Sequence, residues 1–139
     1  MATSQQVAKD KLQHMKIKLT YKPQQNFYVL QIHYANKRTF YAYMCNISNI
    51  HAITNDKQTQ ACIVLCNIIF NAIEYSKHKS ITEYTRVYAC NDKIAQEIYK
   101  QCKRTYNKLK KHLKVSTDTL QAMYKIIIKY PEYRPEVIE

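Results

Sequence analysis

The chain has 139 residues, about one domain, and 46% of them are hydrophobic and 12% aromatic. This composition excludes a disordered chain, because burial of the apolar side chains can offset the entropy lost on folding. Lys and Arg number 22 against 10 Asp and Glu, which gives a formal charge of +12. So large a charge on one domain favours a polyanionic partner.

Two absences exclude further classes of function. The sequence contains no glycine, so a glycine-rich phosphate loop is excluded, and we expect Asn, Asp and Pro in the turns. It has no apolar run long enough to span a membrane, and the polar leader, residues 1–15, lacks the apolar segment of a signal peptide. We therefore expect an intracellular protein, cytoplasmic or nuclear, with no membrane partner.

Five cysteines are spread along the chain, at Cys45, Cys62, Cys66, Cys90 and Cys102. Their odd number and apolar neighbours predict reduced, buried thiols. Cys62 and Cys66 would share a helix face, but no second pair of ligands stands at the spacing of a zinc site. We expect no metal and no other cofactor.

The first part of the single domain predicted for residues 16–139 is rich in strand signals. Residues 16–21 alternate between polar and apolar side chains, as a half-buried strand does. Residues 27–35 and 38–46 are rich in aromatic and β-branched side chains and are joined by a short polar link, which predicts an antiparallel hairpin. Three antiparallel strands are therefore expected in sequence order.

A long helix is predicted from Lys57 to about Ser76, after capping residues at positions 54–56. Its apolar residues lie on nearly every side. Because a helix of this kind is usually buried between layers, we expect it to lie between the sheet and another helix.

The rest of the chain completes the predicted fold. Residues 81–90 predict a fourth strand, and helices are expected at about 93–113 and from the capping segment 116–118 to about Tyr130. The tail from Pro131 is predicted to be extended or a short edge strand. This order predicts an α/β fold with a mixed sheet, in which three antiparallel strands are joined by a parallel crossover strand around a buried central helix.

Several local segments, in the expected order, resemble the ribonuclease H family. Residues 16–23 resemble its first strand, and residues 27–43 resemble the hairpin that follows. Residues 54–57, Thr-Asn-Asp-Lys, resemble the segment that opens its central helix, and residues 88–94 resemble the stretch between its fourth strand and second helix. The resemblance implies a ribonuclease H-like fold.

Hydrolysis in that family requires four carboxylates that hold two divalent metal ions. The resemblance places Tyr21, Thr59 and Asn91 at three of these positions, and none of the three is acidic. Asp56 and Asp92 lie close by in sequence, so a shifted alignment would supply two ligands but not the full set. The resemblance therefore implies an inactive domain, and an active metal-dependent nuclease with displaced carboxylates is the alternative.

The strongest chemical signal is the segment 99–114, which contains seven Lys or Arg and no acidic residue. On a helix these cations fall on adjoining positions and form a basic ridge that would follow phosphates. The alternative is a solvated helix face, but such a face normally alternates Glu with Lys, because like charges at i,i+4 are destabilising. The predicted ridge consists of Lys100, Lys103, Arg104, Lys108, Lys110, Lys111 and Lys114. In the resemblance it occupies the place of the family's basic handle, which grips the nucleic-acid strand.

Two weaker candidates accompany the ridge. The resemblance implies that Thr54, Asn55 and Gln58 contact the minor groove and the 2′-hydroxyls of an RNA strand, and helix capping is the alternative role for Thr54 and Asn55. Four tyrosines of the predicted hairpin could stack on bases, although tyrosine also packs well on a sheet, which we favour. These are Tyr28, Tyr34, Tyr41 and Tyr43.

The sequence thus predicts a non-catalytic nucleic-acid-binding domain of ribonuclease H-like fold that contacts phosphates through a basic helix. A duplex containing RNA is favoured as the ligand, by family analogy alone. Besides the active nuclease, one alternative remains: a viral or accessory module that kept the fold to bind a protein partner or to form a homodimer.

Overall fold

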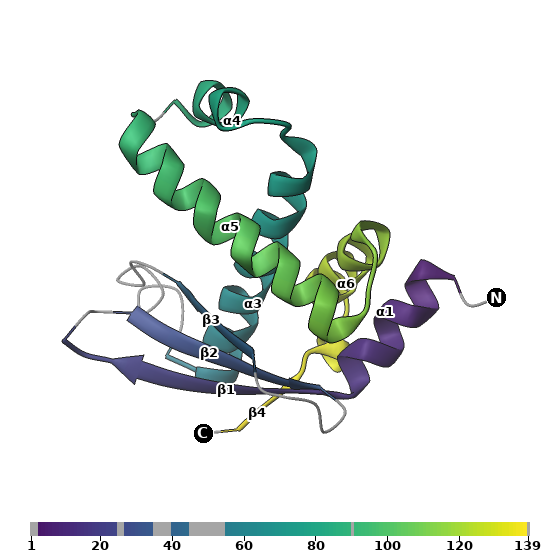
Figure 1. Ribbon diagram of the computed structural model, residues 1–139. Helices are drawn as coiled ribbons and strands as arrows, with labels where there is room; N and C mark the ends of the chain where they lie inside the picture. The colour runs from purple at the N-terminus through teal and green to yellow at the C-terminus, as the bar shows by residue number, and fades with distance from the viewer. Residues whose placement is uncertain (1–2, 25–26, 35–39, 45–54, 90, 139) are drawn as a thin grey trace.

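A computed structural model describes residues 3–24, 27–34, 40–44, 55–89 and 91–138, with the backbone alone for residues 27–28 and 40–44. Its elements follow the order α1 (Ser4–Gln13), β1 (Met15–Lys22), β2 (Phe27–Tyr34), β3 (Phe40–Met44), α3 (Lys57–Lys77), α4 (Ile81–Tyr88), α5 (Asp92–Leu113), α6 (Thr117–Lys129), the short 3-10 helix η1 (Pro131–Tyr133) and β4 (Glu136–Val137). The predicted α/β class and the long helices after residue 56 are confirmed (Figure 1).

The sheet is mixed and has the strand order β3-β2-β1-β4. β1 and β2 pair antiparallel, as do β2 and β3, which confirms the predicted hairpin. β4 pairs parallel with β1 through Lys16 and Ile17. The tail after Pro131 is therefore the short edge strand that the sequence predicted, and it supplies the parallel strand of the sheet.

The predicted strand at residues 81–90 is wrong, because residues 81–88 form helix α4. The Ser80 hydroxyl accepts a hydrogen bond from the backbone N–H of Glu83, and the Glu83 carboxylate accepts one from the backbone N–H of Lys79. The first bond satisfies one of the backbone donors that a helix start leaves open, and the second holds the Glu83 side chain against the residue before the cap, one position earlier than in a capping box. The Ser-Ile-Thr-Glu segment at positions 80–83 is typical of a helix start. The β-branched and aromatic residues that follow are typical of a strand, and they led to the wrong prediction.

The polar leader contains a helix that packs on the rest of the domain. Thr3 caps α1 by accepting a hydrogen bond from the backbone N–H of Gln6, and Ala8 and Leu12 are buried. α1 lies against α6, and its two buried side chains belong to the same core as the sheet. This part of the chain therefore contributes to the fold.

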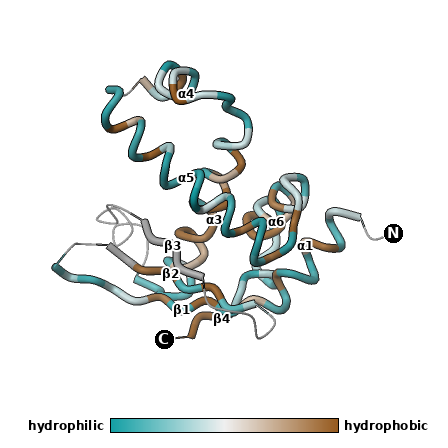
Figure 2. The backbone as a smooth tube through the Cα atoms, viewed as in Figure 1, coloured by the Kyte–Doolittle hydropathy of each residue, from teal (hydrophilic) through white to brown (hydrophobic). Residues whose placement is uncertain are grey.

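The core is centred on α3, which contacts all four strands as well as α5 and α6. Its buried residues include Ala61, Val64, Leu65, Ile69 and Ala72, and the full buried set covers about 220° of the helix circumference. The expectation of a helix buried between the sheet and further helices is confirmed. In Figure 2 the hydrophobic stretches of α3 and α6 gather where the helices meet, whereas α5 is largely hydrophilic. Within the described ranges, no helix is both long enough and apolar enough to cross a membrane.

Two helices end on residues in the left-handed region. Ala89 after α4 has φ 51°, and Lys114 after α5 has φ 52°. The expectation that Asn, Asp and Pro supply the turns is wrong at these two positions. Because a side chain with a Cβ is strained there, each position stores a cost of roughly 1–2 kcal/mol that a glycine would avoid.

The substitution Ala89→Gly should therefore stabilise the domain. Relief of the left-handed strain exceeds the extra entropy of glycine in the unfolded chain, roughly 0.5–1 kcal/mol, so we expect the free energy of unfolding to rise by about 0.5–1 kcal/mol. Chemical denaturation measures it. The matched control, Ala122→Gly inside α6, should lower the same quantity by about 1 kcal/mol, and a loss of stability in both variants would contradict the left-handed cap.

The packing of α1 predicts that a core substitution in the leader is costly. Leu12 is 2% exposed, so Leu12→Ala should lower the free energy of unfolding by about 2–5 kcal/mol. The exposed neighbour Gln13 serves as control, and Gln13→Ala should change stability by less than about 0.5 kcal/mol. Equal stability of the two variants would show that α1 does not pack on the core.

Candidate nucleic-acid interface

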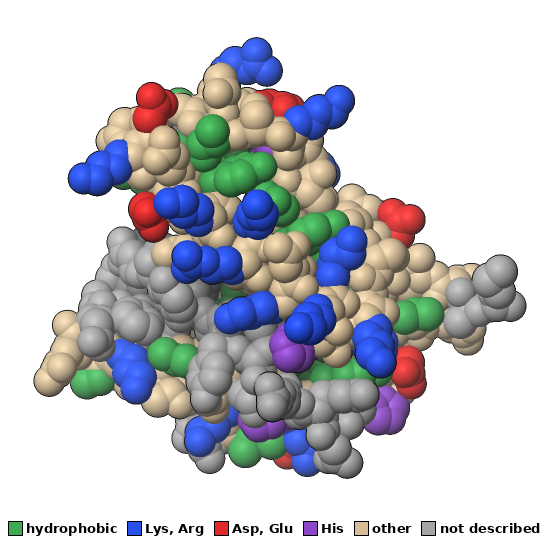
Figure 3. Space-filling view, in the orientation of Figure 1, with side chains coloured by type: hydrophobic (Ala, Val, Ile, Leu, Met, Phe, Trp, Pro, Cys, Tyr) green, Lys and Arg blue, Asp and Glu red, His purple; other side chains and the backbone are tan. Residues whose placement is uncertain are grey.

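The seven cations of the predicted ridge all lie on α5 or at its end, and all are exposed. At 100° per residue they occupy an arc of about 160° on the helix surface. The buried residues Ala95, Cys102, Leu109 and Leu113 lie on the opposite side. Figure 3 shows the Lys and Arg side chains gathered along α5 on one face of the molecule. The structure therefore places the whole predicted ridge on one surface.

These cations have little intramolecular neutralisation. Lys100 lies 4.0 Å from the Glu97 carboxylate, and Lys110 lies over the ring of Tyr106 at 5.1 Å from its centroid. Among the residues that the structure describes, no acidic side chain forms an ion pair with the other six cations of the ridge. Because like charges at i,i+3 and i,i+4 repel one another, the ridge has a net electrostatic cost in the absence of an anion.

Apolar packing fixes the direction in which the ridge points. Leu109 and Leu113 are buried in the main core and hold the basic half of α5 against the body of the domain. The Tyr106 hydroxyl is 2.7 Å from the Thr117 hydroxyl at the start of α6, a hydrogen bond in which either group can donate. Rotation of α5 about its axis would break both contacts, so the ridge stays on the outer face.

An aromatic cluster attaches the other half of α5 to α3 and α4. The ring of Tyr75 is 4.9 Å from that of Tyr99 and 5.4 Å from that of Tyr106, measured between centroids, and Tyr84 lies 5.6 Å from Tyr99. Burial, and next the neighbouring Tyr75, raise the pKa of Tyr99 above its ordinary value. Tyr99 is therefore a neutral phenol at physiological pH, and its role in this geometry is packing.

The second candidate group lies at the start of α3. Thr54 falls outside the described residues, and Asn55 and Gln58 are exposed. Asp56 caps the helix by accepting hydrogen bonds from the Thr59 backbone N–H at 2.8 Å and from the Thr59 hydroxyl at 2.6 Å. Of the two capping candidates, Asn55 does not cap, and neither Asn55 nor Gln58 lies on the basic ridge.

The capping geometry also determines the state of Asp56. The hydroxyl of Thr59 first, and its backbone N–H second, lower the pKa of the Asp56 carboxyl. The carboxylate is therefore charged at neutral pH, next to the positive end of the α3 dipole, where a negative charge is favourable.

The three positions that the resemblance assigns to catalytic carboxylates lie on different elements. Tyr21 is near the end of β1, Thr59 is in the first turn of α3, and Asn91 caps α5 by accepting a hydrogen bond from the Ile94 backbone N–H at 3.0 Å. Figure 1 shows that α5 begins beside α4, beyond the far end of α3. Asn91 and Thr59 are therefore at opposite ends of the central helix.

The two carboxylates that lie close to these positions in sequence, Asp56 and Asp92, are also at opposite ends of α3. Asp56 caps the start of α3, and Asp92 is the first residue of α5, beyond the other end of α3. α3 has 21 residues and is therefore about 30 Å long, so one metal site cannot include both groups. In the part of the chain with described side chains, no three His, Cys, Asp or Glu residues form a group that could hold a metal ion.

Three of the five cysteines can be described, and Cys62, Cys66 and Cys102 are free thiols. Cys45 and Cys90 lie outside the described residues. Burial first, and Cys62 second, raise the pKa of Cys66 to about 11, and burial likewise raises that of Cys62. Both thiols are therefore protonated at neutral pH and are poor nucleophiles and poor metal ligands.

Of the four hairpin tyrosines, only the side chain of Tyr34 is described. It is half-buried, packs against the core and has the Lys11 ammonium 4.3 Å from its ring centroid. The side chains of Tyr28, Tyr41 and Tyr43 lie outside the description. The packing role that we favoured is thus found at Tyr34.

Comparisons with protein-family models, with curated proteins and with solved structures found no match to this chain.

Proposed function

We propose that this chain is a non-catalytic domain that binds nucleic acid through the basic ridge of α5. The observation that carries the proposal is the exposure of seven Lys or Arg on one face of a helix whose other face is buried. An ordinary surface helix intersperses acidic residues among such cations, and this ridge has none after Glu97. A polyanion would supply the missing negative charge.

The dimensions of the ridge suit a nucleic-acid backbone. From Lys100 to Lys114 the helix rises about 20 Å, and one strand of a B-form duplex presents about six phosphates over that length of axis. Contacts of this kind neutralise phosphates and release counterions, which gives affinity without sequence specificity. We therefore propose sequence-independent binding. An RNA-containing duplex is the favoured ligand, on the resemblance to ribonuclease H alone, which stays a prediction.

The ridge predicts binding that depends strongly on salt and on three of its residues. With five to seven phosphate contacts, the log of the affinity should fall against the log of salt concentration with a slope of about −5 to −6. Changing Lys103, Arg104 and Lys108 to Glu should abolish binding, because repulsion replaces attraction at the centre of the ridge. Fluorescence anisotropy with a labelled RNA–DNA hybrid and the corresponding DNA duplex measures both effects.

The chain offers a control with the same change in charge. Lys79, Arg86 and Lys125 are exposed and lie off the ridge, so their replacement by Glu alters the net charge equally. The control should weaken binding only slightly, through the overall field. If both triple variants bind like the parent, α5 is not the interface.

Catalysis is not expected. The carboxylates nearest to the positions implied by the resemblance, Asp56 and Asp92, are at opposite ends of α3, and two-metal hydrolysis needs ligands that converge on ions about 4 Å apart. Incubation of the protein with an RNA–DNA hybrid and magnesium or manganese should leave the hybrid intact on a gel. Cleavage that disappears in Asp56→Asn or Asp92→Asn would instead support the displaced-carboxylate nuclease.

One observation favours a second function, assembly with a protein partner or a second copy. Val87 is 56% exposed, Ile94 is 52% exposed, and Ile98 and Tyr88 are also exposed, so α4 and the start of α5 carry apolar side chains in solvent. Light scattering with and without a duplex distinguishes the two functions. A dimer without nucleic acid, and no change of mass on adding it, would favour assembly.

A further inference from the structure

The sheet has one face buried by helices and one face that the described helices leave open (Figure 1). On β1 the buried side chains Met15, Ile17 and Leu19 alternate with the exposed side chains Lys16 and Lys18. Residues directly opposite on paired strands point to the same face. The open face therefore also carries His33, which pairs with Lys16 on β2, and Glu136, which pairs with Lys16 on β4.

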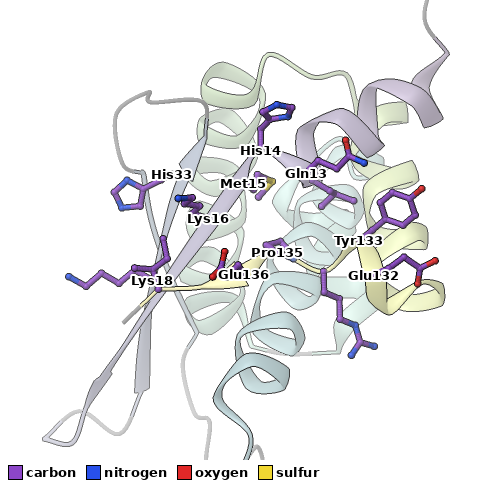
Figure 4. Close-up of a pocket in the computed structure, with 13 residues that line it drawn as sticks. Gln13, His14, Met15, Lys16, Lys18, His33, Glu132, Tyr133, Pro135 and Glu136 are labelled. Atoms are coloured by element: carbon purple, nitrogen blue, oxygen red, sulfur yellow. The ribbon is translucent and has the colours of Figure 1, made fainter.

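A groove of about 870 Å³ runs along this face. β1 contributes Lys16 and Lys18, β2 contributes His33, and the end of α1 contributes Gln13 and His14. The opposite wall is the segment 132–138, which includes β4. Figure 4 shows the side chains of β1 and β2 on one side of the groove and those of Glu132, Tyr133 and Pro135 on the other.

The lysines of the groove are available to a ligand. Among described residues, neither Lys16 nor Lys18 forms an ion pair, and the same holds for Lys22 at the end of the strand. Side chains two apart on a strand are about 6.6–6.8 Å apart along it, which is comparable with the separation of neighbouring phosphates in a nucleic-acid strand. Lys16 and Lys18 thus match two neighbouring phosphates, and Lys22 lies on the same face, about 13 Å further along the strand than Lys18.

We propose that the open face of the sheet is a second phosphate-binding surface, in which Lys16 and Lys18 contact successive phosphates of a nucleic-acid strand. This inference rests on the proposed nucleic-acid function and extends it to a surface separate from the α5 ridge. Arg134 adds a permanent cation to the groove, and Glu132 and Glu136 oppose it in part. Glu136 is the nearest acid in register with Lys16, so it weakens the attraction for phosphate.

The chemistry of the face favours nucleic acid over an anionic membrane surface. Interfacial binding to lipid requires apolar side chains that enter the acyl boundary. The described β1 residues on this face are Lys16, Lys18, Thr20 and Lys22, and their neighbour on β4 is Glu136. The groove also contains Tyr133 and Ile138, which is 38% exposed, and Val29 lies opposite Thr20 on β2. One exposed isoleucine is a small apolar area for insertion into lipid, whereas the lysines can contact the repeated phosphates of a polymer.

The test uses the full chain and conservative neutral substitutions. In Lys16→Gln/Lys18→Gln, the salt slope for a labelled RNA–DNA hybrid should become less steep by about 1.8, the contribution of two phosphate contacts. The control Lys79→Gln/Lys125→Gln removes the same charge away from both surfaces and should keep the parent slope. Glu136→Gln should bind more tightly than the parent, because it removes an anion from the groove. Thermal unfolding confirms that each variant is folded.

The outcomes separate this inference from the proposed function. If Lys16→Gln/Lys18→Gln keeps the parent slope while the α5 triple variant loses binding, the sheet surface is refuted and the ridge stands. If the α5 variant binds normally while the sheet variant has the shallower slope, the ridge is refuted and the sheet surface stands. Absence of binding by the parent protein overturns both. Binding to phosphatidylserine vesicles that requires Lys16 and Lys18, with no change in hybrid binding, would assign the face to membranes.

Discussion

The burial of α3 over more than half of its circumference is the constraint on which the rest of the domain depends. A helix with so wide an apolar face is stable in water only if more than one element covers that face. The sheet covers one side, and α5 and α6 cover the others. The position of α5 is therefore a consequence of the hydrophobic requirement of α3, and the direction of the basic ridge follows from the burial of Leu109 and Leu113.

Stability and charge oppose one another in this molecule. A formal charge of +12 on a chain of 139 residues disfavours the compact state through self-repulsion, and the repulsion is strongest along α5, where cations follow one another at helical spacing. The apolar face of α5 offsets that cost by packing on α3. Sequences depart from the usual rules of local structure most often at functional sites. Among the described helices, α5 departs furthest from a balanced surface charge.

How far the sequence predicted this structure depended on the length and periodicity of each segment. The long helices α3, α5 and α6 were predictable because their apolar periodicity extends over many residues, and the basic ridge followed from the segment 99–114 alone. α4 was missed because eight residues carry little periodicity and β-branched and aromatic residues favour a strand. The lysines of β1 could be predicted from the alternation of polar and apolar residues in the sequence. Their role depends on which face of the sheet the helices leave open, and the sequence of a single strand does not show which face that is.

The proposal that the chain binds nucleic acid depends on where the structure places charge, and only the preference for an RNA-containing duplex depends on the resemblance to ribonuclease H. The parallel neighbour of β1 is the tail strand β4, and the segment predicted for that role, residues 81–90, is helical over residues 81–88. The connection from α3 to α5 therefore extends away from the sheet, and α5 returns toward it (Figure 1). This course brings the basic end of α5, through Leu109 and Leu113, into the same core as β1 and β2. The helical cations and the strand lysines are consequently held by one rigid core, so their relative positions are fixed before any ligand binds, and the entropy cost of arranging them is met during folding.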